Sequence, residues 1–453
     1  MPGRAGHPRE PGVRNRSSLE HSFRALRHRN FRLFVTGQFI SLIGTWMQTV
    51  ALGWLIYRLT HSPFLLGLAG FLSQIPSLFF SPLAGVLADR WNRHRMVIGT
   101  QCLFMLQALV LAALVLSGRA TIFEILALNL FLGFVSAADV PARQSFVIEM
   151  VQDRDDLPNA IALNSSVFNV ARLVGPSIAG VLIGLVSEGV VFLLNGLSYV
   201  AVLAALIAIR VPRRERHATS APNVWAHLAE GVRYVAHFAP IRAVLLLLGL
   251  VGLVGTPYAV LMPMFAADVL HGGSHTLGFL VASIGLGALT GALFLARRRS
   301  VRGLGNVIVW AVVAFALGLM ALALVRREWI ACVLLAITGF GMMVHMASSN
   351  TIVQTLVDHD KRGRVMSLYT VAFMGTMPVG SLLAGALAAR IGAPRTVAIG
   401  GAICLVAAAL FARALPGLRA QVRPIYARLG ILPEIASGLQ AGEEPGPVSV
   451  TRE

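Results

Sequence analysis

The sequence predicts an all-α membrane protein with twelve transmembrane helices arranged as two pseudo-symmetric six-helix bundles. Hydrophobic residues make up 56% of the 453 residues and charged residues only 13%, about half the charge of an average soluble domain. The hydrophobic residues form long blocks, and a block of about 20 crosses a bilayer core as a helix. A segment of the first half also recurs in the second. The first two observations argue against a soluble protein, and the repeat predicts two equivalent halves.

Twelve apolar blocks follow one another along the chain. The first is too long for the apolar region of a signal peptide, and no small-residue cleavage site follows it, so we expect it to remain as the first helix. The short connections "THSPF", "SGRA" and "RREW" require the helices that they join to run antiparallel. The predicted helices cover residues 33–57, 64–88, 96–117, 121–140, 163–186, 189–209, 242–265, 276–296, 306–325, 329–351, 366–389 and 395–412.

The basic residues predict the orientation. If the N-terminus is cytoplasmic, 31 of the 38 Arg and Lys residues lie in cytoplasmic segments, six lie in the opposite hairpins, and Arg172 lies within a helix. The positive-inside rule therefore places both termini in the cytoplasm. The same distribution explains the net charge of +18 without a nucleic-acid partner.

The longest polar interior stretch separates six helices from six. Within it, "VWAHLAEGVRYVAHF" has helical apolar spacing, which predicts a short amphipathic helix on the cytoplasmic surface. The C-terminal segment "LQAGEEPGPVSVTRE" is polar and rich in Pro and Gly, so we expect the tail to be partly disordered. The predicted parts are a basic N-terminal segment at 1–30, a bundle at 31–209, a linker at 210–240, a bundle at 241–412 and a tail at 413–453.

The two halves share a segment at a separation of 205 residues. "DRDDLPNAIALNSSVFNVARLVGPSIAG" aligns without gaps with "DHDKRGRVMSLYTVAFMGTMPVGSLLAG". The matches include Asp153 with Asp358, Phe168 with Phe373, Gly175 with Gly380 and Gly180 with Gly385. The alignment predicts that helices 5 and 11 are equivalent. A parallel six-helix repeat is the plan of one large transporter class, with a site at mid-membrane between the repeats.

A short, densely charged segment, "GVLADRWNRHR", links predicted helices 2 and 3. It resembles the loop signature G-x-L-A-D-R-x-G-R-[RK] of the major facilitator superfamily, with Asn92 and His94 as departures. The resemblance covers about residues 30–412 and implies a transporter that works by alternating access. It also implies a cytoplasmic latch that pairs Arg93 with acids and is built from Gly85, Asp89, Arg90, Arg93 and Asp139. The alternative is that these charges only set topology.

Predicted helix 5 carries "ARLVGPSIAG". Small residues recur every four positions at Ala171, Gly175 and Ala179, so another helix can approach closely. Pro176 removes one backbone hydrogen bond and weakens the helix locally. The pattern resembles the exporter-associated signature of the family, which implies a hinge at Gly175, Pro176 and Gly180. Ordinary small-residue packing is the alternative.

Polar and aromatic residues within the predicted spans are candidates for substrate binding. Arg172 must face protein or water, where it binds an anionic substrate or a counter-acid, or else locks helix 5 through carbonyls or Asn169. Each of the other candidates either contacts substrate or holds helices together. The candidates are Gln38, Trp46, Gln48, Gln74, Asn129, Asn169, Arg172, Tyr258, His345, Asn350, Tyr369 and Met374. A lining of this kind suits an amphipathic organic molecule.

Proton coupling is expected from the family resemblance, although no acid is embedded in helix 1. The candidate proton carriers are Glu124, Asp139 and His345. The three cysteines form no CxxC motif and indicate neither a metal site nor a disulfide. No cofactor is predicted, and no phosphate-binding loop points to ATP as the energy source.

Three further segments narrow the resemblance from the superfamily to one of its branches: "FRALRHRNFRLFVTGQFISLIGTWMQ", "DVPARQSFV" and "KRGRVMSLY". They resemble the transmembrane secretion effector branch, which includes enterobactin exporter-like and macrolide-efflux-like proteins. The resemblance implies a monomeric exporter of a small organic molecule in a bacterial inner membrane, in contact with membrane lipids. A lipid flippase or a non-transporting sensor on the same fold is the alternative, and a membrane enzyme is disfavoured.

Overall fold

The computed structural model describes residues 24–151, 154–209, 224–298, 300–358 and 360–428. Its regular structure in this part of the chain is helical, and twelve helical segments are long and apolar enough to cross a membrane. The all-α class and the twelve predicted spans are therefore confirmed. The first six spans are α2 (Arg29–Thr60), α3 (Pro63–Arg90), α4 (Arg93–Leu116), α5 (Ile122–Met150), α6 (Leu157–Leu185) and α7 (Glu188–Ala208).

The second six spans include two interrupted helices. Span seven is a chain of short helices from Ala239 to Val269: α9 (Ala239–Leu250), η3 (Val251–Gly255), η4 (Thr256–Leu261), α10 (Met262–Met264) and η5 (Phe265–Val269). Span eleven comprises α14 (Arg362–Thr370), η6 (Val371–Gly375) and α15 (Thr376–Ile391). The remaining spans are α11 (Ser274–Ala296), α12 (Leu304–Leu322), α13 (Glu328–Leu356) and α16 (Ala393–Arg428).

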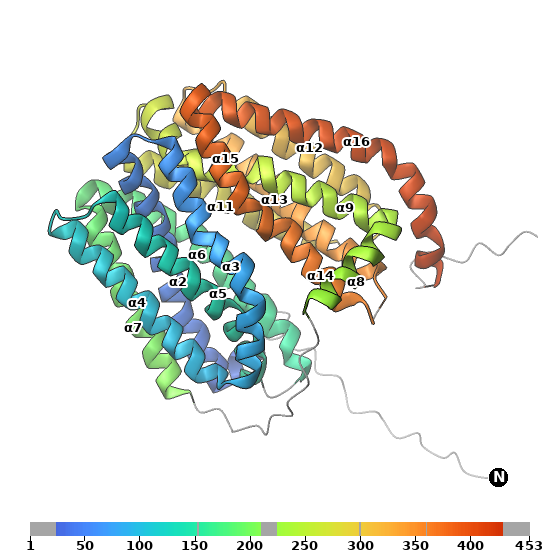
Figure 1. Ribbon diagram of the computed structural model, residues 1–453, viewed down its shortest axis with the longest axis horizontal. Helices are drawn as coiled ribbons and strands as arrows, with labels where there is room; N and C mark the ends of the chain where they lie inside the picture. The colour runs from blue at the N-terminus through green and yellow to red at the C-terminus, as the bar shows by residue number, and fades with distance from the viewer. Residues whose placement is uncertain (1–23, 152–153, 210–223, 299, 359, 429–453) are drawn as a thin grey trace, which may run out of the picture. The chain divides into compact units, whose positions relative to one another are not determined.

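The chain divides into two compact units (Figure 1). Unit 1 comprises Met1–His61, Leu72–Ser220 and Gly272–Ala282, and unit 2 comprises Ser62–Phe71, Ala221–His271 and Ser283–Glu453. The division cuts α3 after Phe71 and α11 after Ala282. Each unit therefore contains one helix end from the other half of the sequence.

The same packing pattern occurs in each half. In the first half, α2 packs against α6 and α7, while α4 packs against α5 and α7. In the second half, span seven packs against α15 and α16, while α12 packs against α13 and α16. In each half, the first span packs against the fifth and sixth, and the third span packs against the fourth and sixth. This shared pattern supports the internal repeat.

Two helices, α5 and α16, continue furthest past the ends of their apolar blocks. α5 continues to Met150 rather than ending near 140, because buried Ala142, Phe146 and Met150 keep helical spacing after the charged residues begin. α16 likewise continues to Arg428, past the predicted end at 412. The linker helix is present as α8 (Val224–His237), in agreement with the prediction.

Spans seven and eleven contain π-helical turns at η3, η5 and η6. Pro257 and Pro263 lie in span seven and lack the backbone N–H groups that a regular helix needs. Such π-bulges occur frequently at functional sites. Their equivalents in the first half, α2 and α6, are continuous, so the repeat is conserved in packing but not in helix regularity.

Candidate substrate-binding site

A close approach between α6 and α2 positions the candidate site of the first half. A Cβ added at Gly175 would lie 2.6 Å from the Cβ of Trp46 and 2.9 Å from the carbonyl oxygen of Ile43. Only glycine fits this crossing without a shift of the backbone. The equivalent Gly380 of the second half meets the carbonyl oxygen of Leu253 in the same way. Both repeats therefore use a glycine where the fifth helix crosses the first.

Three side chains form a cluster beside this crossing. The ring of Trp46 on α2 lies edge-on to Phe168 on α6, with 5.7 Å between the ring centroids. The guanidinium carbon of Arg172 lies 5.6 Å from the centroid of the Trp46 ring. Such a cation–π contact contributes about 0.5–2 kcal/mol, depending on desolvation. Arg172 and Trp46 lie near the middle of their helices, where the prediction placed them.

The cluster belongs to a partly exposed face within an apolar span. Along α6, Ser165 and Phe168 are exposed, and Asn169 and Arg172 are half-buried. They recur at three- and four-residue intervals and so share one side of the helix. An arginine at mid-membrane costs roughly 2.5–3.5 kcal/mol against lipid. This face therefore points towards protein or water rather than hydrocarbon.

The equivalent face of the second half has a different chemistry. The shift of 205 residues places Thr370, Phe373, Met374 and Met377 where the first half has Ser165, Phe168, Asn169 and Arg172. Met374 is 59% exposed and lies in the π-helical turn η6. The first face thus offers a cation, and the second offers an aromatic ring and polarisable thioethers.

Gln48 lies in a buried network instead of on the exposed face. Its amide nitrogen donates to Gln107 Oε1 at 3.0 Å, and its amide oxygen accepts from Asn195 Nδ2 at 2.7 Å. The network joins α2, α4 and α7, and Gln48 is only 4% exposed. Gln48 therefore holds helices together.

We predict that Gln48→Leu lowers the free energy of unfolding by about 1–3 kcal/mol, because it leaves buried amides of Gln107 and Asn195 without partners. Thermal unfolding in detergent measures this loss. Transport by the folded fraction should keep its apparent affinity for substrate. A changed affinity with unchanged stability would instead make Gln48 a substrate contact.

The other predicted candidates are distributed over both halves. Gln38 and Asn129 are buried, whereas Gln74 and Asn350 are half-buried. Asn169 donates to the carbonyl of Ser165 at 2.9 Å. Tyr258 packs edge-on against Phe315.

His345 is fully buried on α13. Its Nδ1 lies 3.5 Å from Ser349 Oγ, and its Nε2 has no hydrogen-bond partner among the described residues. The buried Ser348 hydroxyl is likewise without a partner in that part of the chain. Nearby, Tyr369 donates to the carbonyl of Met346 at 2.8 Å. These groups form a buried polar region in the middle of α13.

The carboxylate of Asp139 on α5 accepts three hydrogen bonds from side chains of α4 and α5. Thr100 Oγ1 donates to its carboxylate at 2.8 Å, Gln101 Nε2 at 2.9 Å, and Arg143 Nε at 2.9 Å. Asp139 is 2% exposed, and its charge is compensated by the buried donors Thr100 and Gln101 and by the half-buried Arg143. Because α5 continues past residue 140, Arg143 follows Asp139 by one helical turn.

Arg93 contacts a different acid. Its Nη1 lies 2.8 Å from Glu149 Oε1, which joins the start of α4 to the end of α5. The side chains of Asp89 and Arg90 lie outside the described residues, and Gly85 has open space at its Cβ position. Among the described side chains, Arg93 thus pairs with Glu149 and Asp139 pairs with Arg143, and the predicted cluster of Asp89, Arg93 and Asp139 stays a prediction.

Glu124 has a local structural contact. Its carboxylate accepts from the backbone N–H and the hydroxyl of Thr121, and Thr121 caps the first turn of α5 in return. This is a capping box, which satisfies helix N-terminal donors.

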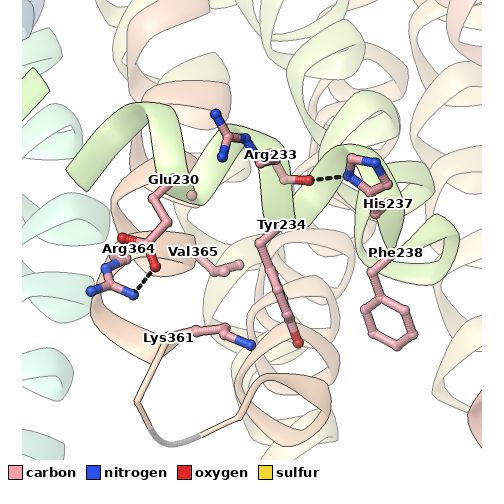
Figure 2. A pocket seen from close by; sticks show the side chains of 9 residues that line it. Glu230, Arg233, Tyr234, His237, Phe238, Lys361, Arg364 and Val365 are labelled. Atoms are coloured by element: carbon pink, nitrogen blue, oxygen red, sulfur yellow. Dashed lines mark hydrogen bonds and ion pairs between the residues drawn. The ribbon is translucent and has the colours of Figure 1, made fainter. Parts of the chain in front are cut away.

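The linker helix α8 packs against the start of α14 around a cavity of about 420 Å³ (Figure 2). Glu230 pairs with Arg364 at 2.6 Å, and Lys361 Nζ lies 4.9 Å from the centre of the Tyr234 ring. Burial and neighbouring Asp358 raise the pKa of Tyr234, so its phenol stays protonated at neutral pH. The linker is thereby attached to the helix that begins span eleven.

The prediction missed several residues of these sites. Phe168 was named only as a repeat match, yet it completes the aromatic cluster. Arg143 and Glu149 were assigned to a loop, although the spacing of Asp139 and Arg143 is a recognisable helical pair. Thr100 and Gln101 carried no signal, because their role depends on the packing of α4 against α5.

A family model described as transmembrane secretion effector matches residues 20–453. The Staphyloferrin A transporter of Staphylococcus aureus is 26% identical over 379 residues, which cover 83% of this chain and 94% of that protein. Macrolide efflux protein A of Streptococcus pyogenes is 24% identical and covers 82% and 92%, respectively. Enterobactin exporter EntS of Salmonella typhimurium is 26% identical and covers 83% and 89%.

Solved structures show the same fold. The nucleoside transporter NupG superposes with a TM-score of 0.65 at 15% identity, over 85% of this chain and 99% of that one. At this identity the likeness concerns the fold alone.

Proposed function

Because the chain belongs to the transmembrane secretion effector family of membrane transporters, we propose that it exports a small organic molecule across the bacterial inner membrane by alternating access. The export of siderophores and macrolides by relatives supports this direction. The main observation in support is a partly exposed face of α6 and α2 with polar and aromatic side chains. Arg172 lies at its centre, in the middle of an apolar span.

We propose that the substrate is amphipathic and bears an anionic oxygen group. A guanidinium presents planar pairs of N–H donors that match a carboxylate or a similar group. Trp46 and Phe168 supply aromatic surface beside it. A siderophore-like molecule fits this description better than a neutral one.

We propose that the charged pairs of α4 and α5 act as a latch. Arg93–Glu149 joins α4 to α5, whereas Asp139–Arg143 lies within α5 and Asp139 reaches α4 through Thr100 and Gln101. Together these contacts stabilise one conformation of this region. The hinge proposed at Gly175, Pro176 and Gly180 lies on α6, where Gly175 allows the close crossing with α2. Movement at this crossing would displace Trp46 and so couple the hinge to the aromatic cluster.

We also propose that export is driven by protons, with His345 as the favoured carrier. Glu124 caps α5, and Asp139 is occupied by three donors, whereas the Nε2 atom of buried His345 has no partner among the described residues. Complete burial means that His345 exchanges a proton with water only when the surrounding helices open.

Inverted vesicles test the proposed function with enterobactin, staphyloferrin A and a macrolide as candidate substrates. We expect at least one siderophore to accumulate when a pH gradient is imposed, and an uncoupler to abolish accumulation. His345→Gln should retain downhill flux but lose the response to the gradient. Lipid reorientation without accumulation of any candidate would favour the flippase alternative and contradict the proposal.

A further inference from the structure

A second cavity, of about 460 Å³, is lined by residues from the ends of α9, α12, α13 and α16, entirely within unit 2. This volume is within the roughly 300–1,000 Å³ of typical small-molecule sites. Its wall includes the apolar side chains of Val244, Ile352, Leu356, Phe411 and Leu415. Three arginines, Arg302, Arg419 and Arg423, also line it.

The unpredicted extension of α16 forms one side of this cavity. Leu415, Leu418 and Val422 recur at three- and four-residue intervals and line the cavity together. Arg419 and Arg423 follow on the same side, one turn apart. The helix curves at this end (Figure 1) and contains Pro416 and Pro424, which weaken its backbone hydrogen bonding.

The charges of the lining are unbalanced. None of the described lining residues is acidic. Arg419 donates to Asn306 Oδ1, whereas neither Arg302 nor Arg423 takes part in an ion pair within the described part of the chain. An apolar wall beside uncompensated guanidinium groups suits a ligand with an anionic head and a hydrocarbon body.

We infer that this cavity binds one anionic phospholipid, with the headgroup phosphate at Arg302 and Arg423 and an acyl chain along Leu415 and Val422. A membrane lipid is favoured over a soluble anion because the arginines lie where apolar spans end, at the depth of lipid phosphates. The site is separate from the cluster at Arg172 and concerns binding rather than transport.

Native mass spectrometry of the full-length protein, delipidated in neutral detergent and then incubated with one defined phospholipid, tests this inference. We expect retention of phosphatidylglycerol but not of phosphatidylcholine. Arg302→Gln and Arg423→Gln should each weaken retention about fivefold, since one basic side chain at a lipid surface contributes on that scale. Arg413→Gln, on the same helix but outside the lining, is the matched control and should retain the lipid.

A second variant separates the contact with the acyl chain from the effect of the arginine charges. Val422→Trp fills the apolar side without changing charge, and we expect it to weaken phosphatidylglycerol retention as well. Equal retention of both lipids, or equal loss with Arg413→Gln, would overturn the site. Thermal protection by inorganic phosphate as strong as that by phosphatidylglycerol would overturn the lipid assignment.

Discussion

Arg172→Gln is expected to reduce export of an anionic substrate about tenfold or more while the protein stays folded. The guanidinium is the charged group of the Trp46–Phe168–Arg172 cluster, and hydrogen bonds to charged groups contribute roughly 1.5–3 kcal/mol. The loss should appear as a raised apparent KM for the carboxylate siderophore staphyloferrin A in inverted vesicles. Thermal unfolding should change little, because glutamine is cheaper than arginine within a span.

Arg172→Lys is the matched control for this prediction. It keeps the charge but loses the planar fork of donors, so we expect intermediate transport. A macrolide without an anionic group should be affected less than a siderophore. Equal loss for every compound, together with a lower melting temperature, would instead indicate that Arg172 only stabilises α6 against Trp46.

Asp139→Asn is expected to lower the free energy of unfolding by about 3 kcal/mol. The carboxylate is 2% exposed and accepts from Thr100, Gln101 and Arg143. Asparagine removes the charged acceptor of these three donors, and a hydrogen bond to a charged group contributes about 1.5–3 kcal/mol; Arg143, whose side chain is 24% exposed, also loses its partner. Thermal unfolding in detergent measures the effect, and transport per folded molecule should also change, because Asp139–Arg143 is part of the proposed latch.

Two comparisons test the cause of this loss. Glu149→Gln removes the more exposed Arg93 pair and should cost about 1 kcal/mol or less. The double variant Asp139→Asn, Arg143→Gln should recover part of the stability of the single variant, because no unpaired charge remains. Additive losses in the double variant would show that the Asp139–Arg143 contact contributes nothing.

The membrane fold was predictable because its signals are continuous in sequence. Apolar blocks of spanning length gave the twelve helices, and the 205-residue repeat placed Gly175 and Gly380 at equivalent crossings. Arg172 was identified as a site candidate because charge is rare within a span. These predictions depend only on local composition and spacing.

The remaining features depend on packing between helices. The apolar blocks ended at residues 140 and 412, yet α5 continues because Ala142, Phe146 and Met150 are buried at helical spacing. In α16 the same spacing continues with buried Leu415 and with Leu418 and Val422, which line the second cavity. That continuation gives Asp139 a partner one turn away, at Arg143. The contact of Arg172 with Trp46 requires the position of the α2–α6 crossing, which no spacing within α6 reveals.

Accessibility of the α6 face from each side of the membrane is the most direct test of alternating access to the Arg172 cluster. Asn169→Cys can be introduced after Cys102, Cys332 and Cys404 are replaced by serine, and probed with a membrane-impermeant maleimide in right-side-out and inverted vesicles. We predict labelling from both sides, with the ratio shifted by bound siderophore or by the pH gradient. Labelling from one side only, unchanged by either treatment, would contradict the account.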